Sequence, residues 1–271
     1  MGLRDVRLVV CDMDGTLLNA NHEVSSRFYV LFEQLQGLGI HFAAASGRQH
    51  DSIRQKLAPI ADKIYIIAEN GAYASQAGEP FLLTTLPTEP SAQILTKMSS
   101  VKQANVVVCT PHEAYVLGKD QSFIGYMQEY YTSHRVVTDL IPLPKEAVKL
   151  AIHHPVSSEQ FVWPLLSEGC EGLKVKVSGQ HWVDVSHPEA HKGNALAVLQ
   201  KRLGITAEQT MAFGDYLNDV ELLQGAAYSY AMAEAHPDLA AVARYRAGSH
   251  TAEGVEDVLQ ELVKAHRPQD R

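Results

Sequence analysis

Cysteine is scarce in this 271-residue chain, and the three cysteines present form no CxxC motif. They are Cys11, Cys109 and Cys170, an odd number without the spacing of a disulfide framework. Such residues are typical of reduced thiols in a cytoplasmic protein. No stretch approaches the roughly 18 consecutive apolar residues of a membrane span, and the N-terminus lacks the layout of a signal peptide. We therefore expect a soluble cytoplasmic protein with no membrane span.

Long basic stretches are absent as well, and the formal net charge is −8. A surface of that charge attracts nucleic acid poorly, because binding to its phosphate backbone depends on clustered Lys and Arg. Neither a P-loop nor a GxGxxG motif occurs, which argues against a nucleotide-driven kinase or a dinucleotide enzyme. The net charge still allows a local basic site for phosphate, since a few basic residues can reverse the potential inside a cleft.

Two aspartates stand at the end of the apolar run Leu8–Cys11. The run predicts a short buried strand, and Gly15 in the motif DMDGT (residues 12–16) predicts the turn that ends it. Asp12 and Asp14 are therefore expected at the carboxyl end of a strand, which is where open α/β sheets bind ligands. Neighbouring carboxylates repel each other, so we expect a divalent cation or a shared proton to relieve them.

Further polar segments follow apolar runs or open a helix. They are Ser46-Gly47-Arg48, Lys192-Gly193-Asn194, and Gly214-Asp215 with Asn218-Asp219 shortly after. Each segment alone is compatible with a small-residue turn, a solvated lysine or an acidic helix start. Their order along the chain and their placement at strand ends make a joint coincidence improbable, so we expect them to meet at one site.

Residues 6–68 alternate between short apolar strands and helical patterns. The expected strands are 6–11, 40–45 and 64–68, and the expected helices are 24–38 and 49–57. This alternation is the signature of an α/β fold with a doubly wound, Rossmann-like parallel sheet. The same pattern resumes near residue 191, with strands near 210–213 and 227–231.

The pattern differs between residues 84 and 188. There we expect helix, two strands, helix, strand, helix and two strands, including strands 148–153, 173–179 and 182–186 and a helix at 157–168. Short turns between adjacent strands favour an antiparallel sheet with helices on one face. We therefore predict a discontinuous core of residues 1–83 and 189–271, with an inserted α+β cap domain of residues 84–188.

Taken together, these motifs resemble those of the haloacid dehalogenase-like phosphohydrolases, and within them the Cof-type, sugar-phosphatase-like branch with a type IIB cap. The resemblance covers essentially the whole chain. It rests on the DxDGT motif at 12–16, the SGR turn at 46–48, Lys192 and the GDxxND motif at 214–219. It implies a phosphatase that hydrolyses small phosphorylated metabolites, such as sugar phosphates, with Mg²⁺ as its cofactor.

The resemblance also implies roles for individual aspartates. Asp12 is expected to be the nucleophile that forms an aspartyl-phosphate, and Asp14 the general acid and base. Mg²⁺ is expected on the Asp12 carboxylate, the Asp14 backbone carbonyl and the Asp215 carboxylate, because this ion prefers oxygen ligands. Asp219 is expected to lie close by and to support the metal site.

Phosphate contacts are implied for four further residues. Those expected to bind the phosphoryl group with Asp12 are Ser46, Gly47, Lys192 and Asn218. Arg48 is expected to form a structural ion pair with an acid such as Glu69 or Asp219.

Other conspicuous residues are expected to be structural. His187 and His191 have zinc-like spacing, but a proline lies between them and no cysteine follows, so we expect no zinc site. His153 and His154 end a predicted strand of the cap and are expected to be a cleft wall or a surface pair. Cys11 is expected to be a small core residue.

Two other functions remain open at this point. A phosphomannomutase-like phosphomutase shares the aspartyl-phosphate but returns the phosphoryl group to its substrate. A non-catalytic phosphate-ligand sensor usually lacks a catalytic aspartate, whereas all four aspartates of the motifs are present. We favour the hydrolase, with a cap that acts as a lid on two links near residues 83–84 and 187–188, and we expect a monomer or a weak homodimer.

Overall fold

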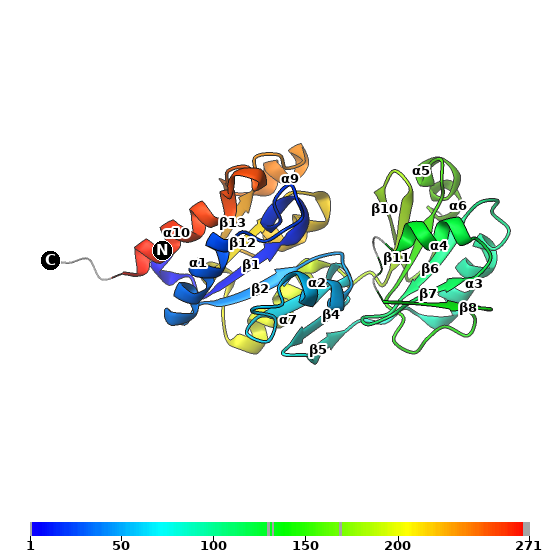
Figure 1. Cartoon of the computed structure of the whole chain (residues 1–271), viewed down its shortest axis with the longest axis horizontal. Coiled ribbons are helices and arrows are strands. Elements are labelled where there is room, and N and C mark those ends of the chain that lie inside the picture. The colour runs from blue at the N-terminus through cyan, green and yellow to red at the C-terminus, as the bar shows by residue number, and fades with distance from the viewer. Residues whose placement is uncertain (1, 129–130, 132, 168–169, 268–271) are drawn as a thin grey trace.

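The computed structural model describes residues 2–128, 131, 133–167 and 170–267, which form two bodies side by side along the long axis (Figure 1). The larger body contains an eight-stranded sheet, in spatial order β14 (Tyr245–Arg246), β13 (Tyr228–Ala231), β12 (Thr210–Gly214), β1 (Leu8–Asp12), β2 (His41–Ala45), β3 (Tyr65–Ala68), β4 (Tyr73–Gln76) and β5 (Glu79–Leu83). Its strands come from both the N-terminal and the C-terminal parts of the chain.

β1 lies in the middle of this sheet, between β12 and β2, and pairs in parallel with both. All five of its residues are buried, because helices cover both faces. Val9 and Cys11 pack on one face and Leu8 and Val10 on the other. Cys11 is thus the small core residue that the sequence predicted.

Two layers of helices cover the larger sheet. One layer packs with Val9 and contains α1 (Ser26–Gly37), α2 (His50–Lys56) and α10 (Gly254–His266). The opposite layer packs with Val10 and contains α7 (Lys192–Leu203), α8 (Val220–Gln224) and α9 (Pro237–Val242). The expected helices at 24–38 and 49–57 correspond to α1 and α2, and Ser25 caps the first of them by accepting a hydrogen bond from the Phe28 N–H.

The edge of the larger sheet contains a hairpin that the sequence analysis missed. β4 pairs antiparallel with β3, and β5 pairs antiparallel with β4, so the sheet is mixed rather than parallel throughout. The two strands are joined at Ala77 and Gly78, which both have positive φ, 50° and 85°. Two such residues in a row are typical of a tight hairpin turn. β5 is largely exposed and contains Pro80, as an edge strand tolerates.

The smaller body contains a six-stranded sheet, in spatial order β10 (Lys174–Gly179), β11 (Trp182–Ser186), β9 (Lys149–His153), β6 (Asn105–Cys109), β7 (Ala114–Leu117) and β8 (His134–Val137). All pairs are antiparallel except β7 with β8. β8 was not predicted, since its polar and half-exposed residues give no apolar run.

Helices lie on both faces of the smaller sheet, so the expectation of helices on one face was wrong. α3 (Thr88–Met98) and α6 (Trp163–Leu166) pack in the apolar cluster that contains Leu150, and α5 (Ser158–Phe161) precedes α6. α4 (Gln121–Met127) packs on the opposite face, with Ala151. Adjacent residues of β9 lie on opposite faces of the sheet, and both faces are apolar. Helices therefore have to cover both faces to keep them from water.

The helix expected at 157–168 is divided in the structure, and residue 168 lies outside the described residues. α5 ends at Phe161 and α6 begins at Trp163, with Pro164 in the first turn of α6. Proline has no N–H to continue the hydrogen bonds of a preceding helix, which explains the division.

The observed architecture confirms the predicted fold class. It is an α/β fold whose doubly wound core sheet is interrupted, after β5, by the chain of the second sheet, and is resumed by α7. Within the described part of the chain, no helix combines the length and the apolar character that crossing a membrane requires.

Candidate active site

The carboxyl ends of β1, β2 and β12 meet at one edge of the larger sheet. Asp12 is the last residue of β1, and its register partner Ala45 is the last residue of β2, directly before Ser46. Gly214 ends β12, which pairs with β1 on its other side, and Asp215 follows it. Parallel neighbours end at the same edge, so polar groups far apart in sequence are brought together there.

The turn after β1 requires glycine at position 15. Gly15 has a φ of 75°, in the left-handed region, and a Cβ atom there would lie 2.3 Å from Oδ2 of Asp215. The absence of a side chain therefore allows the turn to approach the Asp215 carboxylate closely. Asp14, one residue earlier, is brought to the same place.

Lys192 joins two of the aspartates at the centre of the site. Its Nζ donates to Oδ1 of Asp12 at 2.5 Å and to Oδ1 of Asp219 at 2.6 Å. Lys192 and Asp219 have no exposed area, and Asp12 is 4% exposed. Burial alone lowers the pKa of Lys192, but the two carboxylates outweigh it and leave that pKa above its ordinary value. The ammonium group is thus held in its charged form.

Asp219 also fixes the loop after β12. Its Oδ2 accepts hydrogen bonds from the backbone N–H groups of Asp215 at 3.2 Å and of Tyr216 at 3.4 Å. A Cβ atom at Gly214 would lie 2.5 Å from Cβ of Asp219, so only glycine fits under this carboxylate. Asp219 is therefore bound on both oxygens by the protein itself, to Lys192 on one side and to this loop on the other.

The carboxylates form a group of donors suited to a hard divalent cation. Oxygens of Asp12, Asp215 and Asp219 lie within 4.8 Å of one another. Oδ2 of Asp12 is buried and has no hydrogen-bond partner among the described residues. Burial, and then the neighbouring Asp219, raises the pKa of Asp215 to about 6, and burial likewise raises the pKa of Asp12. A cation would relieve both, and Mg²⁺ prefers oxygen donors of this kind.

Arg48 does not pair with either acid expected from the sequence. Its Nε donates to Oδ2 of Asp14 at 2.7 Å and its Nη2 to Oδ1 of Asp14 at 2.6 Å, a two-pronged contact. The expected pairing with Glu69 or Asp219 was therefore wrong. β1 and β2 are adjacent, so the turn that carries Arg48 faces the turn that carries Asp14, whereas Glu69 and Asp219 are each paired with a lysine.

Ser46, Gly47 and Asn218, three of the residues expected to bind phosphate, line one cavity with Asp12. Lys192 does not line it, since it is fully buried against Asp12. The Ser46 hydroxyl is buried and accepts a hydrogen bond from the Arg48 N–H at 3.2 Å. The side-chain amide of Asn218 donates to Oδ1 of Asn70 at 3.0 Å, and a Cβ atom at Gly47 would lie 3.0 Å from that same oxygen. Asn70 thus joins two of these residues, a contact that the sequence analysis missed.

Asn70 could have been proposed as a site residue from the sequence. It stands in the segment Glu69-Asn70-Gly71 directly after β3, and its φ is 56°. Asparagine is among the few residues that adopt this left-handed conformation readily. An asparagine before a glycine at a third strand end was therefore a further candidate for the site.

The cavity, of about 1240 Å³, is lined by both bodies of the molecule. The smaller body contributes Lys149 at the start of β9, and Lys176 and Asp184 from its two last strands. Nζ of Lys149 lies 2.6 Å from Oε2 of Glu69, which belongs to the larger body. Burial lowers the pKa of Lys176, and the neighbouring Lys174 adds to this effect. These basic groups give the cavity a second source of positive charge.

The histidines singled out in the sequence have other partners. Nδ1 of His191 accepts from the Asn194 N–H and caps α7, and Nδ1 of His187 accepts from the Glu189 N–H. These two are not part of a metal-binding group within the described residues.

The other pair, His153 and His154, was expected to be a cleft wall or a surface pair. Both residues are instead buried, at 8% and 3% exposed. The ring of His153 packs against Phe123 of α4, with centroids 4.9 Å apart, and the ring of His154 stacks on Phe161. The expectation failed because helices cover both faces of the smaller sheet.

Known proteins share this architecture over nearly the whole chain. A family model described as haloacid dehalogenase-like hydrolase matches residues 9–259. The 5-amino-6-(5-phospho-D-ribitylamino)uracil phosphatase YbjI of Escherichia coli (strain K12) is 30% identical over 269 residues, 98% of this chain and 99% of that protein.

Two solved structures are similar in fold. The crystal structure of SMU.1108c from Streptococcus mutans UA159 has 28% identity and a TM-score of 0.86, covering 96% of this chain and 99% of that one. The subclass IIB sugar phosphatase BT4131 has 21% identity and a TM-score of 0.81, covering 94% of this chain and 98% of that one.

Proposed function

Because the chain belongs to the haloacid dehalogenase-like hydrolase family, as a phosphatase of its Cof-type branch, we propose that it hydrolyses small phosphomonoesters such as sugar phosphates with the help of Mg²⁺. The observation that carries the proposal is the buried Lys192, held between Asp12 and Asp219 at the carboxyl edge of the sheet. A fully buried ammonium with two acids is suited to a site where negative charge accumulates.

The proposed substrate class is supported by one relative and by the cavity. The name of the Escherichia coli relative describes a phosphorylated ribityl group attached to an aminouracil. A cavity of about 1240 Å³ has room for a phosphorylated metabolite of that kind. Lysines on the side of the smaller body can contact polar groups of such a substrate away from the reacting phosphate.

Asp12 is proposed as the nucleophile. Lys192 occupies its Oδ1, while its Oδ2 has no hydrogen-bond partner among the described residues and can attack phosphorus. The attack forms an Oδ2–P bond and breaks the bond from phosphorus to the ester oxygen, which leaves an aspartyl-phosphate. Water then attacks phosphorus, breaks the bond to Asp12 and releases inorganic phosphate.

Asp14 is proposed to move the protons. It would protonate the departing ester oxygen in the first step and take a proton from the attacking water in the second. In this structure Arg48 donates to both oxygens of Asp14 and fixes the position of that side chain. Asp14 must leave Arg48 to deliver a proton in the first step.

The metal-binding residues in this proposal are the Asp12 and Asp215 carboxylates and the Asp14 backbone carbonyl. When bound there, Mg²⁺ would neutralise charge on the phosphoryl group. Asp219 acts as a positioning residue, since its two oxygens already hold Lys192 and the loop that carries Asp215. Ser46, Gly47 and Asn218 are proposed to contact the phosphoryl oxygens.

We propose further that residues 84–188 form a cap domain over a core of residues 1–83 and 189–271. The separation of the strands into two sheets supports this division. Along the chain, the two sheets are linked where β5 leads to α3 and where β11 leads to α7. Such a pair of links allows a lid to admit substrate and then exclude water.

The proposal is tested by screening phosphorylated metabolites for release of inorganic phosphate, in wild type and in Asp12→Asn. We expect release by wild type and a loss of more than about a hundredfold in kcat for the variant. Asp62→Asn, a change at an exposed aspartate, is the control and should retain full activity.

Other outcomes would favour the alternative functions. An isomerised ester formed without phosphate release would identify a phosphomutase. Binding of phosphate esters without any turnover by wild type would indicate a sensor.

A further inference from the structure

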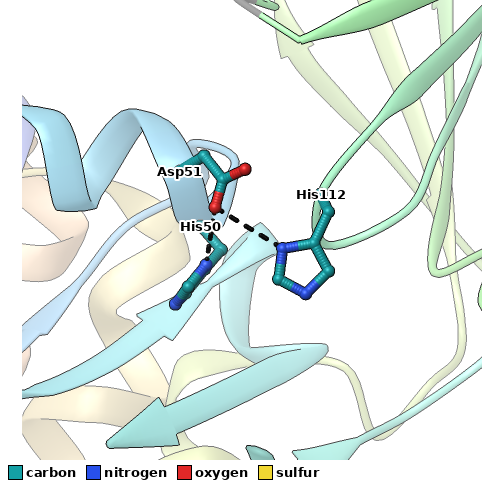
Figure 2. Close-up of side chains that lie close together, drawn as sticks. All are labelled: His50, Asp51 and His112. Carbon is teal, nitrogen blue, oxygen red and sulfur yellow. Dashed lines mark hydrogen bonds and ion pairs between the residues drawn. The ribbon is translucent and has the colours of Figure 1, made fainter. Parts of the chain in front are cut away.

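A second group of metal-binding side chains lies where the two bodies face each other (Figure 2). His50 and Asp51 are the first residues of α2 in the larger body. His112 belongs to the segment between β6 and β7 in the smaller body. Figure 2 shows the three side chains converging, with the carboxylate of Asp51 between the two imidazole rings.

The distances within this group fit a tetrahedral cation. Oδ1 of Asp51 lies 3.0 Å from Nδ1 of His50 and 3.5 Å from Nδ1 of His112, and donor atoms of all three lie within 4.8 Å of one another. Ligands about 2.0–2.1 Å from a tetrahedral ion are roughly 3.3 Å apart. Two of the three separations are therefore close to that value already.

His50 is held in place by groups behind it. Its ring is 2% exposed, and its Nε2 lies 2.9 Å from the hydroxyl of Ser75, which is fully buried on β4. The Tyr73 ring packs edge-on against it, with centroids 5.2 Å apart. Metal-binding histidines usually have their second nitrogen fixed by such a partner. The arrangement leaves Nδ1 directed at Asp51.

The site is accessible from solvent. The side chains of Asp51 and His112 are about half exposed, at 47% and 51%, so an ion can enter from solvent.

We propose that His50, Asp51 and His112 form a site for Zn²⁺ or a similar divalent transition metal, with water as the fourth ligand. Two imidazoles and one carboxylate are a donor set that suits Zn²⁺ and does not suit Mg²⁺. The site is distinct from the cluster of Asp12, which offers only oxygens.

Occupancy of this site is coupled to the arrangement of the two bodies. His112 lies in one body and His50 with Asp51 in the other, so only the closed arrangement presents all three ligands. A ligand that binds one arrangement better shifts the equilibrium toward it. The metal therefore holds the lid against the core, and phosphate release slows because substrate and product exchange through the open arrangement.

The test uses Co²⁺ as a spectroscopic substitute for Zn²⁺, with saturating Mg²⁺ present to occupy the oxygen-only cluster. We expect one equivalent of Co²⁺ to give the visible absorption of a four-coordinate site with nitrogen ligands, and Zn²⁺ to displace it. His112→Ala and Asp51→Asn should each weaken Co²⁺ binding at least about tenfold. His41→Ala, a change at an exposed histidine of β2, is the matched control and should leave binding unchanged.

Absorption of equal strength in His112→Ala, or none in wild type, would overturn the proposal. Co²⁺ binding that is lost in Asp12→Asn and retained in His112→Ala would place the ion at the other cluster and would overturn the proposal as well. Because absorption needs no turnover, failure here is distinguishable from failure of the proposed phosphatase activity. A second measurement, Zn²⁺ inhibition of phosphate release, should be present in wild type and absent in His112→Ala.

Discussion

Nζ of Lys149 lies 2.6 Å from a carboxylate oxygen of Glu69, and this ion pair joins the two bodies of the molecule. Both residues are buried, at 6% and 2% exposed. Burial lowers the pKa of Lys149, but the neighbouring acidic groups, Glu69 first among them, outweigh this effect and raise that pKa above its ordinary value. An ammonium group has three N–H donors, so Lys149 keeps donors for a substrate oxygen beside this ion pair.

We predict that Lys149→Met opens the lid without unfolding the core. Breaking a pair inside a single rigid core costs about 3–5 kcal/mol, because one charge stays buried. In Lys149→Met the two bodies can separate, and water then hydrates the Glu69 carboxylate. The loss of stability is therefore limited to the free energy of separating the two bodies. The free energy of unfolding in urea should fall by less than about 1 kcal/mol, while hydrogen exchange near Gly47 should accelerate.

Two variants serve as controls for this prediction. Arg27→Met breaks the exposed pair of Arg27 with Asp257 and should change neither measurement appreciably. The double variant Lys149→Met with Glu69→Gln leaves no uncompensated charge. It should restore slow hydrogen exchange near Gly47. A large loss of stability in Lys149→Met with unchanged exchange would show that the two bodies are rigidly joined.

Asp14 and Asp215 should differ in their effects on metal dependence. Asp14→Asn keeps the backbone carbonyl proposed to bind Mg²⁺, so turnover should fall about 10²–10⁴-fold at an unchanged Mg²⁺ requirement. Asp215→Ala removes a carboxylate ligand and should raise the Mg²⁺ concentration needed for half-maximal activity. Phosphate release measured across a Mg²⁺ titration checks both, and identical Mg²⁺ curves in both variants and wild type would contradict the proposed division of roles.

Gly15→Ala should damage the metal site more than the fold. Position 15 has a φ of 75°, and the added Cβ would meet Oδ2 of Asp215 at 2.3 Å. Gly78→Ala is a matched control, because its φ is 85° and no heavy atom lies within 4 Å of the added Cβ. Both changes should cost about 1–2 kcal/mol of stability through the left-handed backbone. Only Gly15→Ala should raise the Mg²⁺ requirement, and equal Mg²⁺ curves for the two variants would count against a metal bound beside Asp215.

His153 should make the protein less stable as the pH falls. Burial, and then the neighbouring His181 and His154, lowers the pKa of His153 to about 4. An unfolded histidine titrates near pH ~6.5, so between these values the unfolded chain binds a proton that the native state does not. The free energy of unfolding therefore falls as the pH drops from ~6.5 toward 4, by at most about 3 kcal/mol.

The measurement for His153 is urea unfolding at several pH values between 7.5 and 5, as a difference between wild type and His153→Phe. Phenylalanine keeps a ring against Phe123 and removes the titrating group. The variant should lose less stability on acidification than wild type, whereas His41→Ala should behave as wild type does. Parallel pH profiles for wild type and His153→Phe would refute the prediction.

The convergence of Asp12, Ser46 and Asp215 could be predicted because each stands at the carboxyl end of an apolar run, and parallel strands end at a common edge. The partner of Arg48 could not, since it depends on which turn faces which across β1 and β2. Nothing local in the sequence around Lys149 indicates Glu69 either. That contact exists only because two separately formed sheets face each other.

The hairpin of β4 and β5 was missed for a different reason. Its signal, Ala77-Gly78 between alternating residues, was present but short, and the exposed pattern of β5 gave no apolar run. The division of α5 from α6 was also readable, from Pro164. At the turn between β4 and β5 and at the division of α5 from α6, turn residues and proline therefore predict the structure better than the apolar pattern does.

The position of β1 between β12 and β2 has a consequence for how the chain is made. Ribosomes synthesise β1 near the start and β12 only after every strand of the second sheet. Until Thr210–Gly214 emerge, one side of Leu8–Asp12 has no strand to pair with, although all five residues are buried in the finished protein. Nascent and prematurely terminated chains thus expose an apolar sheet edge, which makes them substrates for chaperones and prone to aggregation.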